Sequence, residues 1–286
     1  MLPPFDLSEP QSLADALKAL ANNSDAQPLA GATNLIPDLR SKRETCRNFI
    51  SLQALHELRY IKRDGDRVTL GARTSIADIL RDDGMKTNAP ALYAAAELFS
   101  GAMVRTAATI GGNICCGSPS ADTVPALLTL GADVTLSGAS GERTIPLDEF
   151  YVDYKKTVMR TDELLTSVSW NIPPEYSANL FYKLARRKGD AITVTGVAVM
   201  IAAEGGKCSI ARVALGSVGP TIFRTRGAEE MLTGKALSED IIEQAARAAA
   251  DQCSPIDDIR ASADYRLQTT HSLTRRLLTQ AWKQVV

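Results

Sequence analysis

The chain has 286 residues, which at about 150 residues per domain suggests two domains. Its apolar fraction of 45% and charged fraction of 23% are ordinary for a globular protein and exclude an intrinsically disordered one. With 32 basic residues against 33 acidic ones and only 5% aromatic residues, the chain lacks the basic excess and the stacking side chains of a nucleic-acid binder.

The sequence also disfavours a membrane span, an export signal and a metal site. The longest nearly uncharged apolar run, 191–203, is shorter than the roughly 20 residues of a spanning helix. Residues 1–6 lack the basic start and apolar core of a signal peptide. The five cysteines are an odd number and form no Cys-x-x-Cys pair, which argues against a disulfide scaffold and against a zinc or iron–sulfur site. We expect a cytoplasmic protein with no metal of its own.

In chain order, the first predicted element is a helix that begins at Ser8. Pro10 in the first turn and Gln11 at the third position complete a capping-box pattern, and apolar residues recur at helical spacing up to Leu20. A short apolar stretch, 28–30, then predicts a strand that leads into a tight turn.

The next part of the chain predicts a hairpin and a series of helices and strands. Asp64-Gly65 between two apolar runs is a strong hairpin signal. The elements predicted after it are a helix capped by Thr74 or Ser75, a buried helix over 89–99, a loop of small residues over 106–113, a helix over 125–130, and strands over 134–136 and 164–170.

Pro173-Pro174 is the clearest linker in the chain, and we place a domain boundary there. Beyond it, strands over 192–203 and 208–218 flank Gly205-Gly206, and the remainder is helical: 239–250, then a long segment ending at 275–278. Strands and helices mix without regular alternation, which predicts an α+β fold.

Two segments of small residues are the most informative part of the sequence. In Ala30-Gly31-Ala32-Thr33-Asn34 and Thr109-Ile110-Gly111-Gly112-Asn113, no side chain is large enough to block the backbone. Successive backbone N–H groups in such turns form anion-binding concavities, and a diphosphate offers charge to both segments. The alternative is that Gly111-Gly112 simply makes a tight turn. Neither segment is a P-loop or a Rossmann fingerprint.

These same segments carry a family resemblance. The first, extended to Leu35, resembles the first diphosphate loop of the FAD-binding medium subunit of molybdenum hydroxylases, the group of xanthine dehydrogenase and carbon monoxide dehydrogenase. The second, continued through Ser118-Pro119-Ser120-Ala121-Asp122, is similar to the second loop of that family. Three later blocks resemble further family motifs: 186–192, 216–221 with Arg224, and 258–266.

The resemblance implies a fold and a cofactor. It implies a para-cresol-methylhydroxylase-type FAD-binding domain over 1–173, made of two α+β subdomains (about 1–56 and 57–173), followed by a C-terminal α+β domain over 174–286. FAD is expected to be noncovalent, because no histidine stands at Gly31 or Gly111 and we expect His56 and His271 to be surface or interface residues.

The resemblance also implies which residues contact FAD. Gly31 to Asn34 are expected on one side of the diphosphate and Gly111 to Asn113 on the other, Asp122 at the ribose or ribityl hydroxyls, Phe99 and Lys183 at the flavin ring, and Leu165 at the adenine or flavin wall. The full set of expected contact residues is Leu29, Ala30, Gly31, Ala32, Thr33, Asn34, Phe99, Ala108, Thr109, Gly111, Gly112, Asn113, Cys116, Asp122, Leu165 and Lys183.

Four positions leave more than one interpretation open. Ala32 stands where the family often has a second glycine, and alanine tolerates a positive φ poorly. Cys115 and Cys116 are interpreted as small residues packed beside the cofactor, with a redox or cluster role as the alternative. Lys183 either places positive charge near the flavin or is an ordinary lysine at a strand end.

The function implied by the resemblance is electron transfer. A partner molybdenum subunit with molybdopterin hydroxylates the substrate, a [2Fe–2S] subunit relays the electrons, and FAD in this chain passes them to NAD or another acceptor. A dimer of such heterotrimers is the implied assembly, without nucleic acid or membrane as partners. Two alternatives are a stand-alone FAD-dependent oxidoreductase and a scaffold subunit that has lost FAD.

Overall fold

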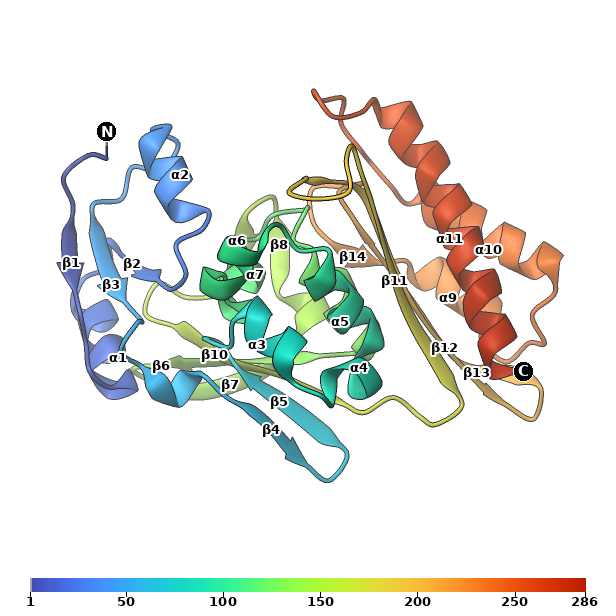
Figure 1. Cartoon of the computed structure of the whole chain (residues 1–286), viewed down its shortest axis with the longest axis horizontal. Coiled ribbons are helices and arrows are strands. Elements are labelled where there is room, and N and C mark those ends of the chain that lie inside the picture. The colour runs from blue at the N-terminus through green and yellow to red at the C-terminus, as the bar shows by residue number, and fades with distance from the viewer. Residues whose placement is uncertain (1) are drawn as a thin grey trace.

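A three-stranded parallel sheet opens the computed structural model, which describes residues 2–286 (Figure 1). The elements of this N-terminal unit are β1 (Asp6–Ser8), α1 (Leu13–Asn22), β2 (Ala26–Leu29), α2 (Leu35–Arg40) and β3 (Asn48–Ser51). The strand order is β1-β3-β2, with both pairs parallel. Leu20, Ile50 and Leu55 are buried in the small core beneath the sheet.

Helix α1 begins later than the sequence predicted. Ser8 is the last residue of β1, where it pairs with Ile50 and is therefore extended, so the predicted helix start at Ser8 is wrong. The true cap is Ser12, whose Oγ accepts a hydrogen bond from the backbone N–H of Asp15 at 3.1 Å. The sheet partner, which lies far away in the sequence, overrides the local capping pattern.

A five-stranded antiparallel sheet forms the middle of the molecule, with a group of helices above it in Figure 1. Its strands, in the order of the sheet, are β4 (Ile61–Asp64), β5 (Arg67–Gly71), β10 (Leu164–Asn171), β6 (Asp133–Gly138) and β7 (Gly141–Pro146). The helices are α3 (Ile76–Arg81), α4 (Met85–Asn88), α5 (Pro90–Glu97), α6 (Ala102–Ala107), α7 (Ile110–Cys115) and α8 (Thr123–Leu130). A separate hairpin is formed by β8 (Tyr151–Asp153) and β9 (Lys156–Thr157), and short 3₁₀ turns cover His56–Leu58 and Leu147–Glu149.

Several predictions for this region are confirmed. The hairpin β4–β5 turns at Gly65, whose φ of +54° is the left-handed conformation that favours glycine. Ser75 caps α3 in a complete capping box with Asp78. Strand β10 is present, but the register shifts between Leu165 and Ser167, and the strand is buried from Leu164 to Trp170 because β5 and β6 flank it on both edges.

The C-terminal part is a four-stranded antiparallel sheet between two layers of helices (Figure 1). Its elements are β11 (Ser177–Ala185), β12 (Thr193–Glu204), β13 (Lys207–Gly216), β14 (Phe223–Arg224), α9 (Arg226–Leu232), α10 (Glu239–Asp251) and α11 (Ala263–Val285). Along β12, Ala198 and Met200 face the core that contains α5 and α8, whereas Val197 and Val199 face the core beneath α10 and α11. Both faces are covered, which explains why the longest apolar run of the sequence is this central strand.

The arrangement confirms the α+β class that the sequence predicted. Pro173 and Pro174 lie in the segment between β10 and β11, where we predicted the domain boundary. Among residues 2–286, no helix is long and apolar enough to cross a membrane.

Candidate functional site

The first small-residue segment runs from the end of β2 to the start of α2 and lies tightly against α6. A Cβ atom added to Gly31 would stand 2.0 Å from the carbonyl oxygen of Ala107, so only glycine fits there. The next residue, Ala32, has a φ of +56°. Ala32 therefore adopts the left-handed conformation, which alanine tolerates poorly, at a position where the family often has glycine.

The backbone of this segment offers free hydrogen-bond donors. Within the part of the chain that the structure describes, the N–H groups of Gly31, Ala32, Thr33 and Asn34 have no hydrogen-bond partner. A left-handed residue among such donors makes the backbone concave toward an anion. The segment therefore has the donors that a diphosphate requires.

The second segment is a helix start rather than the loop that the sequence predicted. Thr109 is the N-cap of α7, and its Oγ1 accepts a hydrogen bond from the N–H of Gly112 at 3.1 Å. The N–H groups of Ile110 and Gly111 donate to the carbonyl oxygens of Thr74 and Ala72, both at 2.9 Å. The predicted loop over 106–113 and the alternative of a Gly-Gly tight turn are both wrong, because bonds to the segment after β5 fix a helical turn here.

This helix start has consequences for how the second segment contributes to the site. A Cβ atom on Gly111 would stand 2.7 Å from the Cβ atom of Ala72, so this glycine allows α7 to pack on the segment after β5. Gly112 is exposed, and its missing side chain leaves the helix start open to solvent. The free N–H donors of the site thus come mainly from the first segment.

Side chains connect the two segments to each other and to α8. Nδ2 of Asn34 donates to Sγ of Cys116 at 3.1 Å, which joins the start of α2 to the end of α7. Oδ1 of Asn113 accepts from the Oγ1 hydroxyl of Thr123 at 2.6 Å, at the first turn of α8. The two predicted diphosphate segments are therefore neighbours in the fold.

Asp122 and Lys183 form a buried ion pair beside these segments. Nζ of Lys183 donates to Oδ2 of Asp122 at 2.6 Å, and the two side chains are only 6% and 10% exposed. Oδ1 of Asp122 accepts from the Oγ1 hydroxyl of Thr193 at 2.5 Å. Burial raises the pKa of Asp122, and the Lys183 ammonium and the Thr193 hydroxyl oppose this rise.

The position of Lys183 in the fold bears on its two interpretations. The residue lies within β11 with a buried side chain that also donates to the carbonyl oxygen of Leu98 at 3.2 Å, so it is not an ordinary lysine at a strand end. Phe99 follows Leu98 directly. Each oxygen of Asp122 accepts one hydrogen bond here, and a carboxylate oxygen has room for a second one. The expected contacts of Asp122, Phe99 and Lys183 with FAD stay predictions.

The remaining predicted contact residues surround this region at different depths. Leu29 is the last residue of β2, and Ala30 follows it, half-buried. Ala108 and Leu165 are each only 4% exposed and belong to the central core. Their contacts with a cofactor stay predictions as well.

The cysteines and histidines have the following environments, and the interpretation of Cys115 and Cys116 as residues beside the cofactor stays a prediction. Cys115 is exposed with its Sγ 3.6 Å from Sδ of Met159, and all five cysteines are free thiols. Across residues 2–286, no cluster of three or more His, Cys, Asp or Glu side chains is suited to a metal ion. His56 is exposed, and His271 lies on α11 with its Nε2 2.9 Å from Oε1 of Glu243.

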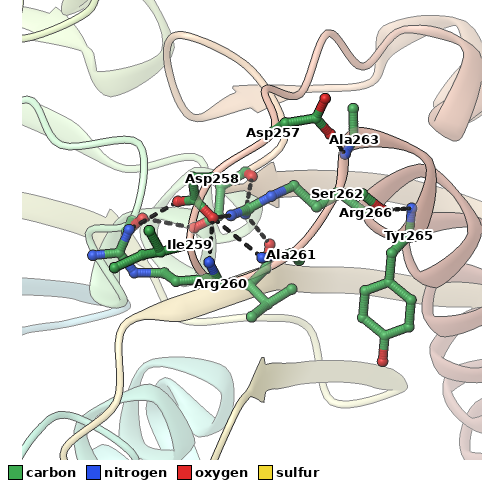
Figure 2. Close-up of polar contacts among 12 residues, drawn as sticks. Asp257, Asp258, Ile259, Arg260, Ala261, Ser262, Ala263, Tyr265 and Arg266 are labelled. Carbon is green, nitrogen blue, oxygen red and sulfur yellow. Dashed lines mark hydrogen bonds and ion pairs between the residues drawn. The ribbon is translucent and has the colours of Figure 1, made fainter.

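The motif at 258–266 holds the start of α11 (Figure 2). Asp258 accepts from the backbone N–H groups of Arg260 and Ala261 and from Nη2 of Arg266 at 2.9 Å. Burial raises the pKa of Asp258, but these hydrogen bonds together outweigh burial and lower it. Nη1 of Arg266 donates to the carbonyl oxygens of Val194 and Ser217. Because Val194 follows Thr193, this motif fixes the strand that supplies a hydrogen bond to Asp122.

Sequence reasoning missed two groups that build the site. The hydroxyl of Thr193 and the carbonyl oxygen of Leu98 hold Asp122 and Lys183 in place, and neither belongs to a motif. Thr193 lies within the apolar strand that the sequence predicted over 192–203, and nothing in that pattern singled it out.

Two family profiles cover most of the chain. The family described as "FAD binding domain in molybdopterin dehydrogenase" matches residues 3–174. The family described as "CO dehydrogenase flavoprotein C-terminal domain" matches residues 180–281. The two small-residue segments and Asp122 lie in the first match, and Lys183 and Thr193 lie in the second.

Individual proteins are similar over the same span. The carbon monoxide dehydrogenase medium chain of Hydrogenophaga pseudoflava is 32% identical over 284 residues, which cover 99% of both chains. A putative xanthine dehydrogenase FAD-binding subunit of Escherichia coli is 30% identical over 275 residues, which cover 94% of this chain and 93% of that one. A solved structure of carbon monoxide dehydrogenase from Hydrogenophaga pseudoflava, which lacks the Mo-pyranopterin moiety of the molybdenum cofactor, superimposes with a TM-score of 0.97 at 31% identity and covers 100% of both chains.

Proposed function

Because this chain belongs to the family of FAD-binding medium subunits of molybdenum hydroxylases, we propose that it is the electron-transfer subunit of such a complex. Bound FAD would supply one-electron and two-electron redox chemistry, receiving electrons from the [2Fe–2S] clusters of a partner subunit and passing them to NAD or another acceptor. The chain itself provides binding, orientation and charge.

The observation that carries this proposal is the set of free N–H groups from Gly31 to Asn34. Gly31, Ala32 and Thr33 are half-buried and Asn34 is exposed, and a diphosphate would satisfy several of these donors at once. The close contact of Gly31 with Ala107 holds this segment against the end of α6. The chain therefore has a cradle whose chemistry fits the diphosphate of FAD.

The ion pair of Asp122 and Lys183 holds an ammonium group and a carboxylate acceptor in fixed positions near the cradle. Asp122 lies at the N-cap of α8, and Lys183 comes from β11 across the predicted domain boundary. The carboxylate retains an acceptor position for a ribose or ribityl hydroxyl. If the flavin ring lies beside Lys183, the ammonium would favour a negatively charged, reduced flavin.

The assembly belongs to the same proposal. A large subunit with molybdopterin and a small [2Fe–2S] subunit would complete the complex, as a dimer of heterotrimers in the cytoplasm. The free thiols of all five cysteines suit a reducing compartment.

The test is to purify the complex through an affinity tag on this chain and to reduce it anaerobically with dithionite. The excess reductant is removed, and NAD, a quinone or oxygen is added while the visible flavin band is followed. The proposal predicts stoichiometric flavin, iron and molybdenum, and return of the oxidised flavin band with at least one acceptor. A tagged chain that purifies without partners or flavin would contradict it and favour the scaffold alternative.

A further inference from the structure

Strand β11 lies at the edge of the C-terminal sheet with one side open. It pairs only with β12. Across residues 2–286, its nine residues make no backbone–backbone hydrogen bond other than those of this pairing. In an antiparallel edge strand, alternate N–H and C=O groups point away from the neighbouring strand. The open side of β11 can therefore pair with another extended segment.

A groove runs between this edge and helix α11, which covers one face of the sheet (Figure 1). The groove has a volume of about 620 Å³, and Leu180, Phe181, Tyr182 and Leu277 contribute to its lining. The side chain of Phe181 is buried in the central core, whereas Leu180 and Tyr182 pack against the core beneath α11. Phe181 therefore borders the groove with its backbone, which places the open edge of β11 in the groove wall.

The charged side chains that line the groove are both cationic. They are Arg276 and Lys283, and no Asp or Glu of the described residues lines the groove. The guanidinium of Arg276 lies over the ring of Tyr182, 4.1 Å from its centroid. In the described chain neither cation has an ion-pair partner, whereas the adjacent Arg275 lies 3.8 Å from Glu243. The groove thus offers two uncompensated positive charges to whatever binds there.

These charges decide between two occupants of the edge. Phe181 is the middle residue of β11, so antiparallel pairing of two copies of this chain would bring both grooves together. Arg276 and Lys283 of one copy would then face the same cations of the other, and like charges at an interface repel. An extended segment that carries Asp or Glu instead meets opposite charge, and its alternate apolar side chains meet Leu180 and Tyr182.

Resting on the proposed function, we propose that an acidic, extended segment of a partner subunit adds a strand to β11 and binds Arg276 and Lys283 through its carboxylates. Successive side chains of a strand point to opposite faces. Tyr182 faces α11, whereas Lys183 points to Asp122 on the other face. The partner segment therefore binds without touching the ion pair of the candidate cofactor site.

The test purifies the complex through an affinity tag on this chain, as the wild type and as two variants. Arg276→Glu with Lys283→Glu reverses both charges of the groove. Lys207→Glu with Lys235→Glu is the matched control, since both lysines are exposed and neither lines the groove. The measurements are the molar ratio of each partner subunit to the tagged chain after a salt wash, and the flavin content per chain.

Two further measurements use the wild type alone. A carbodiimide joins an ammonium directly to a carboxylate as an amide, so mass spectrometry of the treated complex identifies the group that contacts Lys283. Amide hydrogen exchange over residues 180–182 is compared between the complex and the full chain purified without partners, because unpaired edge amides exchange quickly and paired ones are protected.

The inference predicts that the charge reversal lowers the ratio of at least one partner subunit about tenfold or more, as for the loss of close charge pairs at an interface. Flavin content should stay at the wild-type level, and the control should match the wild type in both measurements. Lys283 should be joined to an Asp or Glu of that same subunit. Exchange over residues 180–182 should slow about tenfold or more in the complex.

Three results would each overturn the inference while leaving the proposed function intact. They are a partner ratio of the charge reversal within twofold of the wild type, exchange over residues 180–182 that is equally fast in the complex, and a link from Lys283 to a second copy of this chain. If the charge reversal does not fold, the two measurements on the wild type decide. A wild-type chain that purifies without partners or flavin contradicts the proposed function itself.

Discussion

Gly31→Ala is the substitution that tests the cradle most sharply. The added Cβ atom would lie 2.0 Å from the carbonyl oxygen of Ala107, whereas an ordinary contact begins at 3.4 Å. The first segment must therefore move away from α6 by roughly 1.4 Å along this direction. Because the φ of Gly31 is not positive, the effect is steric rather than a backbone penalty.

The expected cost of such overpacking is about 1–3 kcal/mol of folding free energy, which lowers the Tm by several degrees for a chain of this size. A displacement of this size also misplaces the free N–H groups, so FAD affinity should fall at least about 10-fold. The matched control is Gly189→Ala, since a Cβ atom there meets nothing within 4 Å.

The assay is flavin fluorescence titration of the FAD-free chain, with thermal unfolding followed by circular dichroism. The control should match the wild type in both. The reasoning is refuted if Gly31→Ala binds FAD within twofold of the wild type and melts at the temperature of the control.

Three further predictions concern residues at and near the site. Lys183→Met leaves the Asp122 carboxylate buried without its cation and should lower the free energy of unfolding in urea by about 3–5 kcal/mol. Adding Asp122→Leu to this variant should restore much of that loss. If the two substitutions instead lower the free energy of unfolding additively, the ion pair does not stabilise the fold. Ala32→Gly removes the left-handed alanine and should leave the free energy of unfolding unchanged or raise it by up to about 1 kcal/mol, with FAD affinity retained; a lower Tm would contradict the φ of +56°. Burial raises the pKa of Asp78, but hydrogen bonds from Arg59 and Ser75 outweigh burial and lower this pKa from 3.8 to about 2. At 1.36 kcal/mol per pKa unit, Asp78→Asn should therefore lower the free energy of unfolding by about 2 kcal/mol at neutral pH. Because the folded pKa is depressed, this difference should be complete above pH 3.8 and shrink as the pH falls toward 2; a pH-independent difference in urea titrations would refute it.

Local patterns predicted the elements whose stability is local. The Asp64-Gly65 hairpin, the capping box at Ser75 and the apolar strand over 192–203 all follow from residues within a few positions of one another. The small-residue segments were recognised for the same reason, since glycine beside alanine and threonine marks a backbone that another group approaches.

Distant partners explain what the sequence did not predict. Ser8 belongs to a strand because Ile50 pairs with it, and Gly111 belongs to a helix because its N–H meets the carbonyl oxygen of Ala72. The bond of Asn34 to Cys116 joins residues 82 positions apart. No local pattern encodes such contacts, which form only when the sheets and helices pack together.

The same limit applied to the charges of the site. Lys183 and Asp122 are 61 positions apart, so the sequence left open whether Lys183 was an ordinary strand residue.

Noncovalent binding of FAD by this chain is tested most directly by the visible absorption spectrum of the purified full chain. The spectrum is recorded before denaturation, and again on the filtrate after denaturation. We expect a flavin spectrum whose chromophore passes the filter, or a colourless chain that binds added FAD with an increase in Tm. Colour retained on the denatured protein would contradict noncovalent binding. A colourless chain whose Tm does not respond to saturating FAD would contradict the flavin function.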